Sequence, residues 1–349
     1  MTRKSINLAL QGGGAHGAFT WGVLDRLLEE DRIDIDGITA TSAGAMNAAA
    51  LKAGWVKGGN EGARAQLDQF WNELSAQTAA PNDCVQDWLT AFMPSPQNFA
   101  RAMQYNPAYL AGDAISRVFS PYELNPLNIQ PLRKLVAEMF DFDDVCANKG
   151  PKLFISATNV RSGKIKVFTG DQISEDALLA SACLPTLYQA VEIVDPATGV
   201  LEAYWDGGYM GNPALFPLFY DTTTADVLVV HINPIRREDV PRTAPEIANR
   251  INEISFNSSL LRDLRAINFV HRLIENGAVS PGTMKNVLVH SIQDDALMNQ
   301  LSAVTKLTPD RTLLNRLKSA GRDRMDDFLK NHWDDIGETG TVNLREMFQ

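Results

Sequence analysis

One serine of this chain occupies the kind of turn that presents a nucleophile. The run Thr41-Ser42-Ala43-Gly44 follows an apolar strand that we predict over residues 35–41, and a helix of small residues is predicted over 43–51. Such a turn places the serine hydroxyl near the positive end of the following helix. The usual pattern is G-x-S-x-G, and Ala40 replaces its first glycine. Ser42 is a candidate nucleophile, and a serine that only caps the helix is the alternative.

A second motif is glycine-rich and lies between a strand predicted over residues 6–10 and a helix predicted from about Ala15. It reads Gly12-Gly13-Gly14-Ala15-His16-Gly17. Consecutive glycines at a helix start leave backbone N–H groups uncovered. In a hydrolase such donors form an oxyanion hole, which stabilises the negative charge that develops during acyl transfer.

The same glycines also match the dinucleotide-binding pattern G-x-G-x-x-G through Gly12, Gly14 and Gly17. Asp36 follows at roughly the spacing of about 20 residues at which a ribose-binding acid is expected. That acid should end the second strand, whereas Asp36 precedes most of it. Nucleotide binding is therefore kept as an alternative.

A third motif, Trp205-Asp206-Gly207-Gly208, holds a carboxylate between an aromatic residue and two glycines. This environment fixes the aspartate and leaves its carboxylate free to face a cleft. The alternative is an ordinary Asp-Gly turn that joins two strands.

Together the three motifs resemble the patatin-like phospholipase family, in the same order along residues 6–213. Two further segments resemble family landmarks between the serine and the aspartate: Ala157-Thr158-Asn159 with Gly163, and residues 180–185. The resemblance implies a Ser-Asp dyad with Ser42 as nucleophile and Asp206 as base. It also implies that the oxyanion N–H groups are those of Gly12, Gly13 and Gly14. The residues next to the site are then His16, Gly44, Gly207 and Gly208.

The chain departs from the family pattern at two positions. Ala40 stands in place of the usual glycine, and His16 stands where the family usually has arginine or lysine. The second departure removes the fixed positive charge expected beside the oxyanion loop. We expect His16 to order this loop rather than to act as the base.

The dyad requires an aspartate that accepts a proton. A solvated aspartate, with a pKa of about 4, is a weak base, and burial in a water-poor cleft raises its basicity. A Ser-Asp-His triad is the alternative, with His231, His271 or His290 as the base. The fold of such hydrolases fits poorly, since their serine follows several strands, whereas Ser42 ends the second one here.

The composition restricts the other functions. The 349 residues are 45% hydrophobic and 21% charged, with 32 basic and 42 acidic side chains and a net charge of −10. This balance is typical of a soluble globular protein and argues against nucleic-acid binding, which needs a cationic surface. The three cysteines have no paired spacing, so neither disulfides nor a metal site is predicted. We expect no cofactor and no targeting segment, and a cytoplasmic protein with at most transient contact with a membrane surface.

The predicted elements give an α/β fold, a three-layer sandwich with a largely parallel central sheet. Residues 5–235 are expected to form the catalytic core, and 236–349 a helical segment packed on it, with a long amphipathic helix over 244–275 and a terminal helix over 313–329. The proline- and aromatic-rich stretch 79–131 is interpreted as a lid insertion, or as further core. The oligomeric state is left open.

We therefore expect a serine acyl-ester hydrolase, a phospholipase, lysophospholipase or related lipid esterase, that works through an acyl-enzyme without a metal. A transacylase or thioesterase with the same dyad is the alternative within enzymes. A non-catalytic lipid- or nucleotide-binding protein is the alternative of another class.

Overall fold

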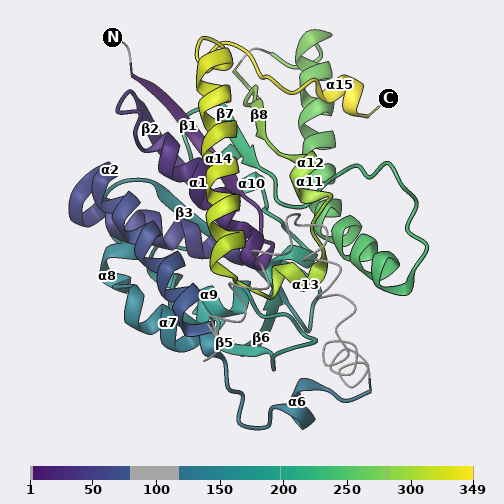
Figure 1. Cartoon of the computed structure of the whole chain (residues 1–349). Helices are drawn as coiled ribbons and strands as arrows, with labels where there is room; N and C mark the ends of the chain where they lie inside the picture. The colour runs from purple at the N-terminus through teal and green to yellow at the C-terminus, as the bar shows by residue number, and fades with distance from the viewer. Residues whose placement is uncertain (1–2, 79–117, 197, 281, 349) are drawn as a thin grey trace.

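The computed structural model describes residues 3–78, 118–196, 198–280 and 282–348, and within them one central sheet carries the fold (Figure 1). The strand order is β5-β6-β3-β2-β1-β7-β8, with β4 paired to β3. The pairs β3-β2, β2-β1, β1-β7 and β7-β8 are parallel, whereas β4, β5 and β6 join antiparallel. The strands are β1 (Lys4–Leu10), β2 (Ile33–Ala40), β3 (Lys152–Asn159), β4 (Ile165–Thr169), β5 (Val191–Val194), β6 (Leu201–Asp206), β7 (Asp226–Val230) and β8 (Leu288–Ile292).

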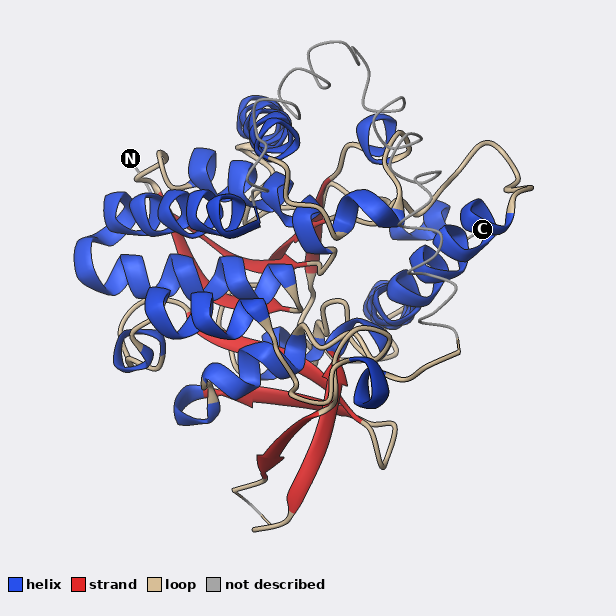
Figure 2. Ribbon diagram, turned by 60° about the horizontal axis from the view of Figure 1, so that its bottom comes forward, coloured by secondary structure: helices blue, strands red, loops and turns tan. Residues whose placement is uncertain are grey.

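The helices cover both faces of this sheet (Figure 2). The longer ones are α1 (Ala18–Leu27), α2 (Ala43–Thr78), α7 (Pro131–Met139), α9 (Glu175–Ser181), α11 (Ala244–Glu275) and α14 (Arg311–His332). The shorter ones are η1 (Gly14–Gly17), α6 (Pro121–Leu124), α8 (Phe142–Val145), η2 (Gly170–Gln172), η3 (Gly207–Tyr209), α10 (Phe216–Tyr220), α12 (Asp295–Met298), α13 (Ala303–Lys306) and α15 (Leu344–Met347).

Strand β7 shows why three layers form. All five of its residues are buried, and successive side chains of a strand point to opposite faces. Leu228 and Val230 join the core beneath α1, α2 and α14, whereas Val227 and Val229 join a second core beneath α11. The predicted α/β fold with a largely parallel sheet is confirmed.

Helix α2 consists of two helical segments joined at a kink, and the first of them contains the helix of small residues that the sequence predicts over 43–51. It is kinked at Gly58 and Gly59, and Gly59 has a φ of 61°. Gly58 and Gly59 both leave the helical conformation, and glycine adopts the positive φ of Gly59 at little energetic cost, so the chain bends here between two helical segments.

The C-terminal residues complete the sheet as well as covering it. Strand β8 pairs with β7 in the central sheet. Helices α1 and α14 run side by side (Figure 1), and their backbones approach closely at Gly22 and Gly321. A Cβ atom on either glycine would collide with the main chain of the other helix. Residues 5–235 and 236–349 thus share one sheet.

Two sequence-based expectations concern membranes and the lid. In the described residues, no helix is both long and apolar enough to cross a membrane. Of the stretch 79–131 that we interpret as a lid, residues 79–117 lie outside the described residues. Its described remainder exposes apolar side chains, namely Phe119, Tyr122, Leu124, Leu127 and Ile129.

Candidate active site

Ser42 lies in the turn between β2 and α2, in a strained backbone conformation. Its φ of 54° lies in the left-handed region, which a non-glycine residue adopts at a free-energy cost. Its backbone N–H donates to Oγ of Ser181 at 2.9 Å, and the N–H of Gly44 donates to the carbonyl of Thr41 at 2.8 Å. The turn is therefore held from α9 as well as from its own backbone.

Glycine is required at position 44 because the start of α2 is pressed against β1. A Cβ atom there would collide with the carbonyl oxygen of Leu10. Ala40, in the place of the usual first glycine of the pattern, is fully buried at the end of β2. The small residues of the turn are thus explained by close packing.

Asp206 ends β6 and is almost fully buried, with 1% of its surface exposed. Its backbone N–H donates to the carbonyl of Cys183 at 2.8 Å, and its carbonyl accepts from the hydroxyl of Thr158 at 2.8 Å. One carboxylate oxygen, Oδ1, accepts from the N–H of Gly208 at 2.7 Å. The other, Oδ2, has no hydrogen-bond partner in the described part of the chain.

Burial raises the pKa of Asp206 to about 7, although the N–H of Gly208, the hydroxyl of Ser42 and the charge of Lys306 each act to lower it. Ser42 and Asp206 are therefore neighbours, even though the hydroxyl makes no hydrogen bond of ordinary geometry with Oδ2. Such contacts are often loose in the absence of substrate. The carboxyl of Asp206 is therefore desolvated and holds a proton more tightly than a solvated aspartate does.

Gly207 and Gly208 have no room for side chains. A Cβ atom on Gly207 would collide with the carbonyl of Ser156 on β3, and one on Gly208 with the ring of Phe256 on α11. The chain passes from Asp206 at the end of β6 directly into η3, which begins at Gly207, so the Asp-Gly pair is not a simple turn between two strands.

The glycine-rich loop departs from expectation at one residue. The N–H of Gly12 donates to Oδ1 of Asn212 at 2.6 Å, so this donor is already engaged within the protein. The N–H groups of Gly13 and Gly14 have no acceptor in the residues that the structure describes. The loop thus offers two free donors where the sequence predicts three.

His16 is buried in η1 and bonds away from the dyad. Its Nε2 lies 2.8 Å from the hydroxyl of Thr305 on α13. That hydroxyl donates its own proton to the carbonyl of Ser302, so Nε2 of His16 is the donor in this pair. Burial and the charge of Lys306 hold the pKa of His16 well below its usual value. His16 is therefore a neutral residue that ties the loop to the C-terminal segment.

The three histidines of the alternative triad make other contacts. His290 bonds through Nε2 to Asp226 at 3.0 Å, and His271 to the carbonyl of Val287 at 2.9 Å. His231 is buried, and burial lowers its pKa to about 4. In the described residues, none of the three has a hydrogen bond to Ser42 or to Asp206.

Asp36, the acid of the dinucleotide pattern, has a structural role. Its carboxylate accepts from the backbone N–H groups of Thr223 and Thr224 at 2.6 and 3.1 Å. These bonds hold the turn that leads into β7. The carboxylate is thus engaged toward the N-terminal ends of β1 and β2, whereas the glycine-rich loop follows the C-terminal end of β1.

Several residues that support the site are absent from the sequence-based prediction. Ser181 lies within a segment recognised as a family landmark, but its bond to Ser42 is visible only in the fold. Asn212 and Asn233 both hold Gly12, the first at its N–H and the second at its carbonyl, at 2.8 Å. Lys306 lies far along the chain, and nothing in its local sequence marks it. Among the described residues, no group of acidic, cysteine or histidine side chains is arranged to hold a metal.

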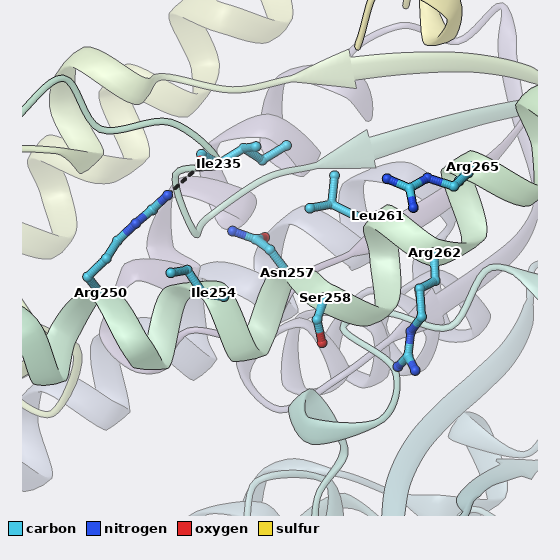
Figure 3. A pocket seen from close by; sticks show the side chains of 8 residues that line it. All are labelled: Ile235, Arg250, Ile254, Asn257, Ser258, Leu261, Arg262 and Arg265. Carbon is cyan, nitrogen blue, oxygen red and sulfur yellow. Dashed lines mark hydrogen bonds between the residues drawn. The ribbon is translucent and has the colours of Figure 1, made fainter. Parts of the chain in front are cut away.

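Outside the dyad, a shallow hollow of about 270 Å³ runs along α11 (Figure 3). Arg250 and Ile254 lie toward one end, and Arg262 and Arg265 toward the other. Arg250 donates to the carbonyl of Ile235 at 2.8 Å. The hollow therefore combines apolar side chains with three cations.

One comparison with known proteins agrees with the resemblance seen in the sequence. The family model described as "Patatin-like phospholipase" matches residues 8–219. Among solved structures, the chain is similar to VipD from Legionella pneumophila, with 15% identity and a TM-score of 0.40 over 94% of this chain and 67% of that chain. Among the curated proteins compared with it, none matches.

Proposed function

Since this chain belongs to the patatin-like phospholipase family, a family of lipid acyl hydrolases, we propose that it cleaves lipid acyl esters with a Ser42–Asp206 dyad. The observation that carries the proposal is Asp206 itself. It is a buried carboxyl with a pKa of about 7, a free Oδ2 oxygen in the described structure, and the Ser42 hydroxyl beside it. Such a group takes a proton far more readily than a solvated aspartate does.

In the first half of the reaction, Oγ of Ser42 forms a bond to the ester carbonyl carbon while its proton passes to Asp206. The carbonyl oxygen takes the negative charge, and the N–H groups of Gly13 and Gly14 stabilise it. When the intermediate collapses, the ester C–O bond breaks and the leaving alcohol takes the proton from Asp206. The product is an acyl-enzyme on Ser42.

In the second half, a water molecule gives a proton to Asp206 and attacks the acyl carbon. The bond from Ser42 to that carbon then breaks, the fatty acid leaves, and Ser42 recovers its proton. Asp206 serves both halves of the reaction. Because its pKa of about 7 is close to neutral pH, it can take up a proton and release it again with only a small free-energy cost.

We further propose that the outer face of α11 touches a phospholipid surface transiently. Ile251 and Ile254 are 63% and 55% exposed there, and the arginines of the neighbouring hollow complement lipid phosphates. On the opposite face of the same helix, Phe256 packs on Gly208 beside Asp206. A lipid at the outer face would be about one helix diameter, roughly 10–12 Å, from the dyad.

A fluorophosphonate probe tests the central assignment, because it labels a serine only where the hydroxyl is activated. We expect mapping of the labelled peptide to give Ser42, and we expect Ser42→Ala and Asp206→Asn to take up no label. Labelling of the Ser42→Ala protein at another serine, with ester hydrolysis retained, would overturn the proposal.

A further inference from the structure

Lys306 ends α13, in the part of the chain that follows the family match over residues 8–219. Its main chain lies directly on the glycine-rich loop. A Cβ atom on Gly14 would collide with the carbonyl oxygen of Lys306, and Thr305 bonds to His16. Gly14 also has a φ of 58°, so both backbone conformation and space require glycine at this position.

The side chain of Lys306 turns inward. Its Nζ donates to Oδ1 of Asn233 at 2.7 Å and to Oδ1 of Asn252 at 3.4 Å. Asn233 is fully buried, and its amide nitrogen donates to the carbonyl of Gly12 at 2.8 Å. Because the ammonium occupies the amide oxygen, the amide nitrogen must face Gly12. Lys306 thus orients the glycine-rich loop through one intermediate side chain.

The charges around the Lys306 ammonium leave its positive charge able to act on Asp206. Four groups influence it or are influenced by it: Glu253 on α11, Arg237 after β7, Asp206 and His16. The negative charge of Glu253 stabilises the protonated form of Lys306 more than any other charge does. Glu253 already forms ion pairs with Arg237 and Arg250, however, at 2.5 and 3.2 Å. Burial lowers the pKa of Lys306 to about 8, so it remains mostly charged at neutral pH. His16 is neutral, so it adds no charge.

We propose that Lys306 is a positioning residue whose ammonium balances the single negative charge that moves between Asp206 and the oxyanion. At rest Asp206 carries that charge. Once the serine proton has passed to Asp206, the ester oxygen carries it. The ammonium stays protonated throughout and exchanges nothing. It attracts the carboxyl of Asp206, and through Asn233 it orients the loop whose N–H groups receive the oxyanion. This role rests on the proposed Ser-Asp mechanism.

A purely structural role for Lys306 would be limited to holding Asn233. The electrostatic role makes an additional demand, since the ammonium must influence the titration of Asp206. It lowers the pKa of that carboxyl, so its removal should move the acidic limb of the activity profile to higher pH. Its own deprotonation, with a pKa of about 8, should in turn reduce activity on the alkaline side.

The experiment measures kcat/KM for the soluble ester p-nitrophenyl butyrate as a function of pH, in the wild type, Lys306→Gln and Lys306→Arg. Glutamine keeps a donor for Asn233 without the charge. We expect it to lower kcat/KM by about tenfold to a hundredfold, mostly in kcat, and to raise the acidic limb by about one pH unit. Arginine should restore the acidic limb and remove the alkaline one, because it stays protonated at every pH measured.

Lys285→Gln is the matched control. Lys285 is also partly buried, donates to the carbonyls of Leu218 and Thr222 at 2.8 Å each, and has a pKa lowered by burial. It lies beside Asp36, away from the dyad, so its loss should lower the melting temperature and leave both limbs in place.

Two results would overturn the proposal. One is a folded Lys306→Gln protein whose acidic limb coincides with that of the wild type. The other, decisive if the glutamine variant does not fold, is a Lys306→Arg protein whose alkaline limb is unchanged. Ser42→Ala distinguishes failure of this proposal from failure of the proposed function. Full activity in Ser42→Ala would refute the dyad. If Ser42→Ala is inactive but the pH profiles of the Lys306 variants keep the limbs of the wild type, only the role of Lys306 is refuted.

Discussion

The backbone N–H of Ser42 donates to the side-chain oxygen of Ser181, at 2.9 Å. The bond ties the strained serine turn to the last residue of α9. Two residues further on, the carbonyl of Cys183 accepts from the N–H of Asp206 at 2.8 Å. One short segment therefore contacts the backbones of both members of the dyad and fixes their separation.

Ser181→Ala should loosen the serine turn. The buried N–H of Ser42 would lose its acceptor, which costs about 1–3 kcal/mol of folding free energy, and turnover should fall by roughly tenfold as the hydroxyl loses its alignment. Denaturant unfolding and esterase assays measure the two effects. Ser174→Ala is the control, since Ser174 caps the other end of α9. It should lower stability by about 1 kcal/mol with unchanged turnover; equal turnover in the two variants would contradict the prediction.

Replacement of Ser42 itself separates activity from strain. Both Ser42→Ala and Ser42→Gly should lack esterase activity, because the nucleophile is gone. Glycine should nevertheless be the more stable of the two by about 1 kcal/mol, because the φ of 54° is unfavourable for a residue with a Cβ atom. Chemical denaturation of the two variants gives the difference directly. Equal stability would show that the turn relaxes once the hydroxyl is removed.

The elements around the dyad were predictable to different degrees. Helix α11 spans Ala244–Glu275, as the sequence predicts, because a capping box of Thr243 and Glu246 marks its start and its apolar spacing continues to its end. Strand β5 spans only four residues, so its alternation of buried and exposed side chains is too brief to mark a strand, and the sequence does not predict it.

The parts of the site that were not predicted depend on long-range contacts. Asn212 engages the N–H of Gly12, which no local pattern reveals. Lys306 meets Gly14 only because the chain returns over the sheet after β8. A lysine in a short helix normally indicates a solvated surface. Motifs thus identify groups that react, whereas the residues that orient them require the fold.

The activity profile should report the environment of Asp206. Catalysis needs the ionised carboxyl, and burial raises its pKa to about 7, so kcat/KM should fall about tenfold per pH unit below that value. A solvated aspartate would keep the enzyme active down to about pH 4. Measurement of p-nitrophenyl butyrate hydrolysis between about pH 5 and pH 9 distinguishes the two. An acidic limb near pH 4 would contradict a desolvated base.

The same carboxyl should reduce the stability of the fold at high pH. Its pKa rises from 3.8 when solvated to about 7 in the folded protein, so the folded state holds the proton more tightly. Its effect on stability is therefore absent in acid, grows unfavourable as pH rises from about 4 to about 7, and stays constant above that, at about 4 kcal/mol at most. Asp206→Asn removes this penalty, so its melting temperature relative to the wild type should be higher at pH 8 than at pH 5.

Asp36→Asn provides a control of opposite sign. Burial acts to raise the pKa of Asp36, but hydrogen bonds from Thr223 and Thr224 outweigh it and the pKa is lowered. This carboxylate stabilises the fold above its unfolded pKa and loses that effect as pH falls through its folded pKa. Asp36→Asn should therefore be less stable than the wild type at pH 8, with the deficit shrinking in acid. Parallel behaviour of the two variants would refute the assignment for Asp206.

Contact between α11 and lipid is tested by a double substitution on its outer face. Ile251 and Ile254 are 63% and 55% exposed, so Ile251→Ser with Ile254→Ser should leave folding unchanged while it removes apolar area that would otherwise enter the interface. Cosedimentation with vesicles of phosphatidylcholine and phosphatidylglycerol should fall at least about fivefold, and hydrolysis of vesicle lipid should fall with it. Hydrolysis of p-nitrophenyl butyrate, which needs no surface, should stay the same.

Val194→Ser, at a residue 56% exposed on β5, is the matched control and should bind as the wild type does. Binding that is equal in all three proteins would exclude this face of α11. A loss of both activities together would instead show that the isoleucines support the catalytic loop from the far side of the helix.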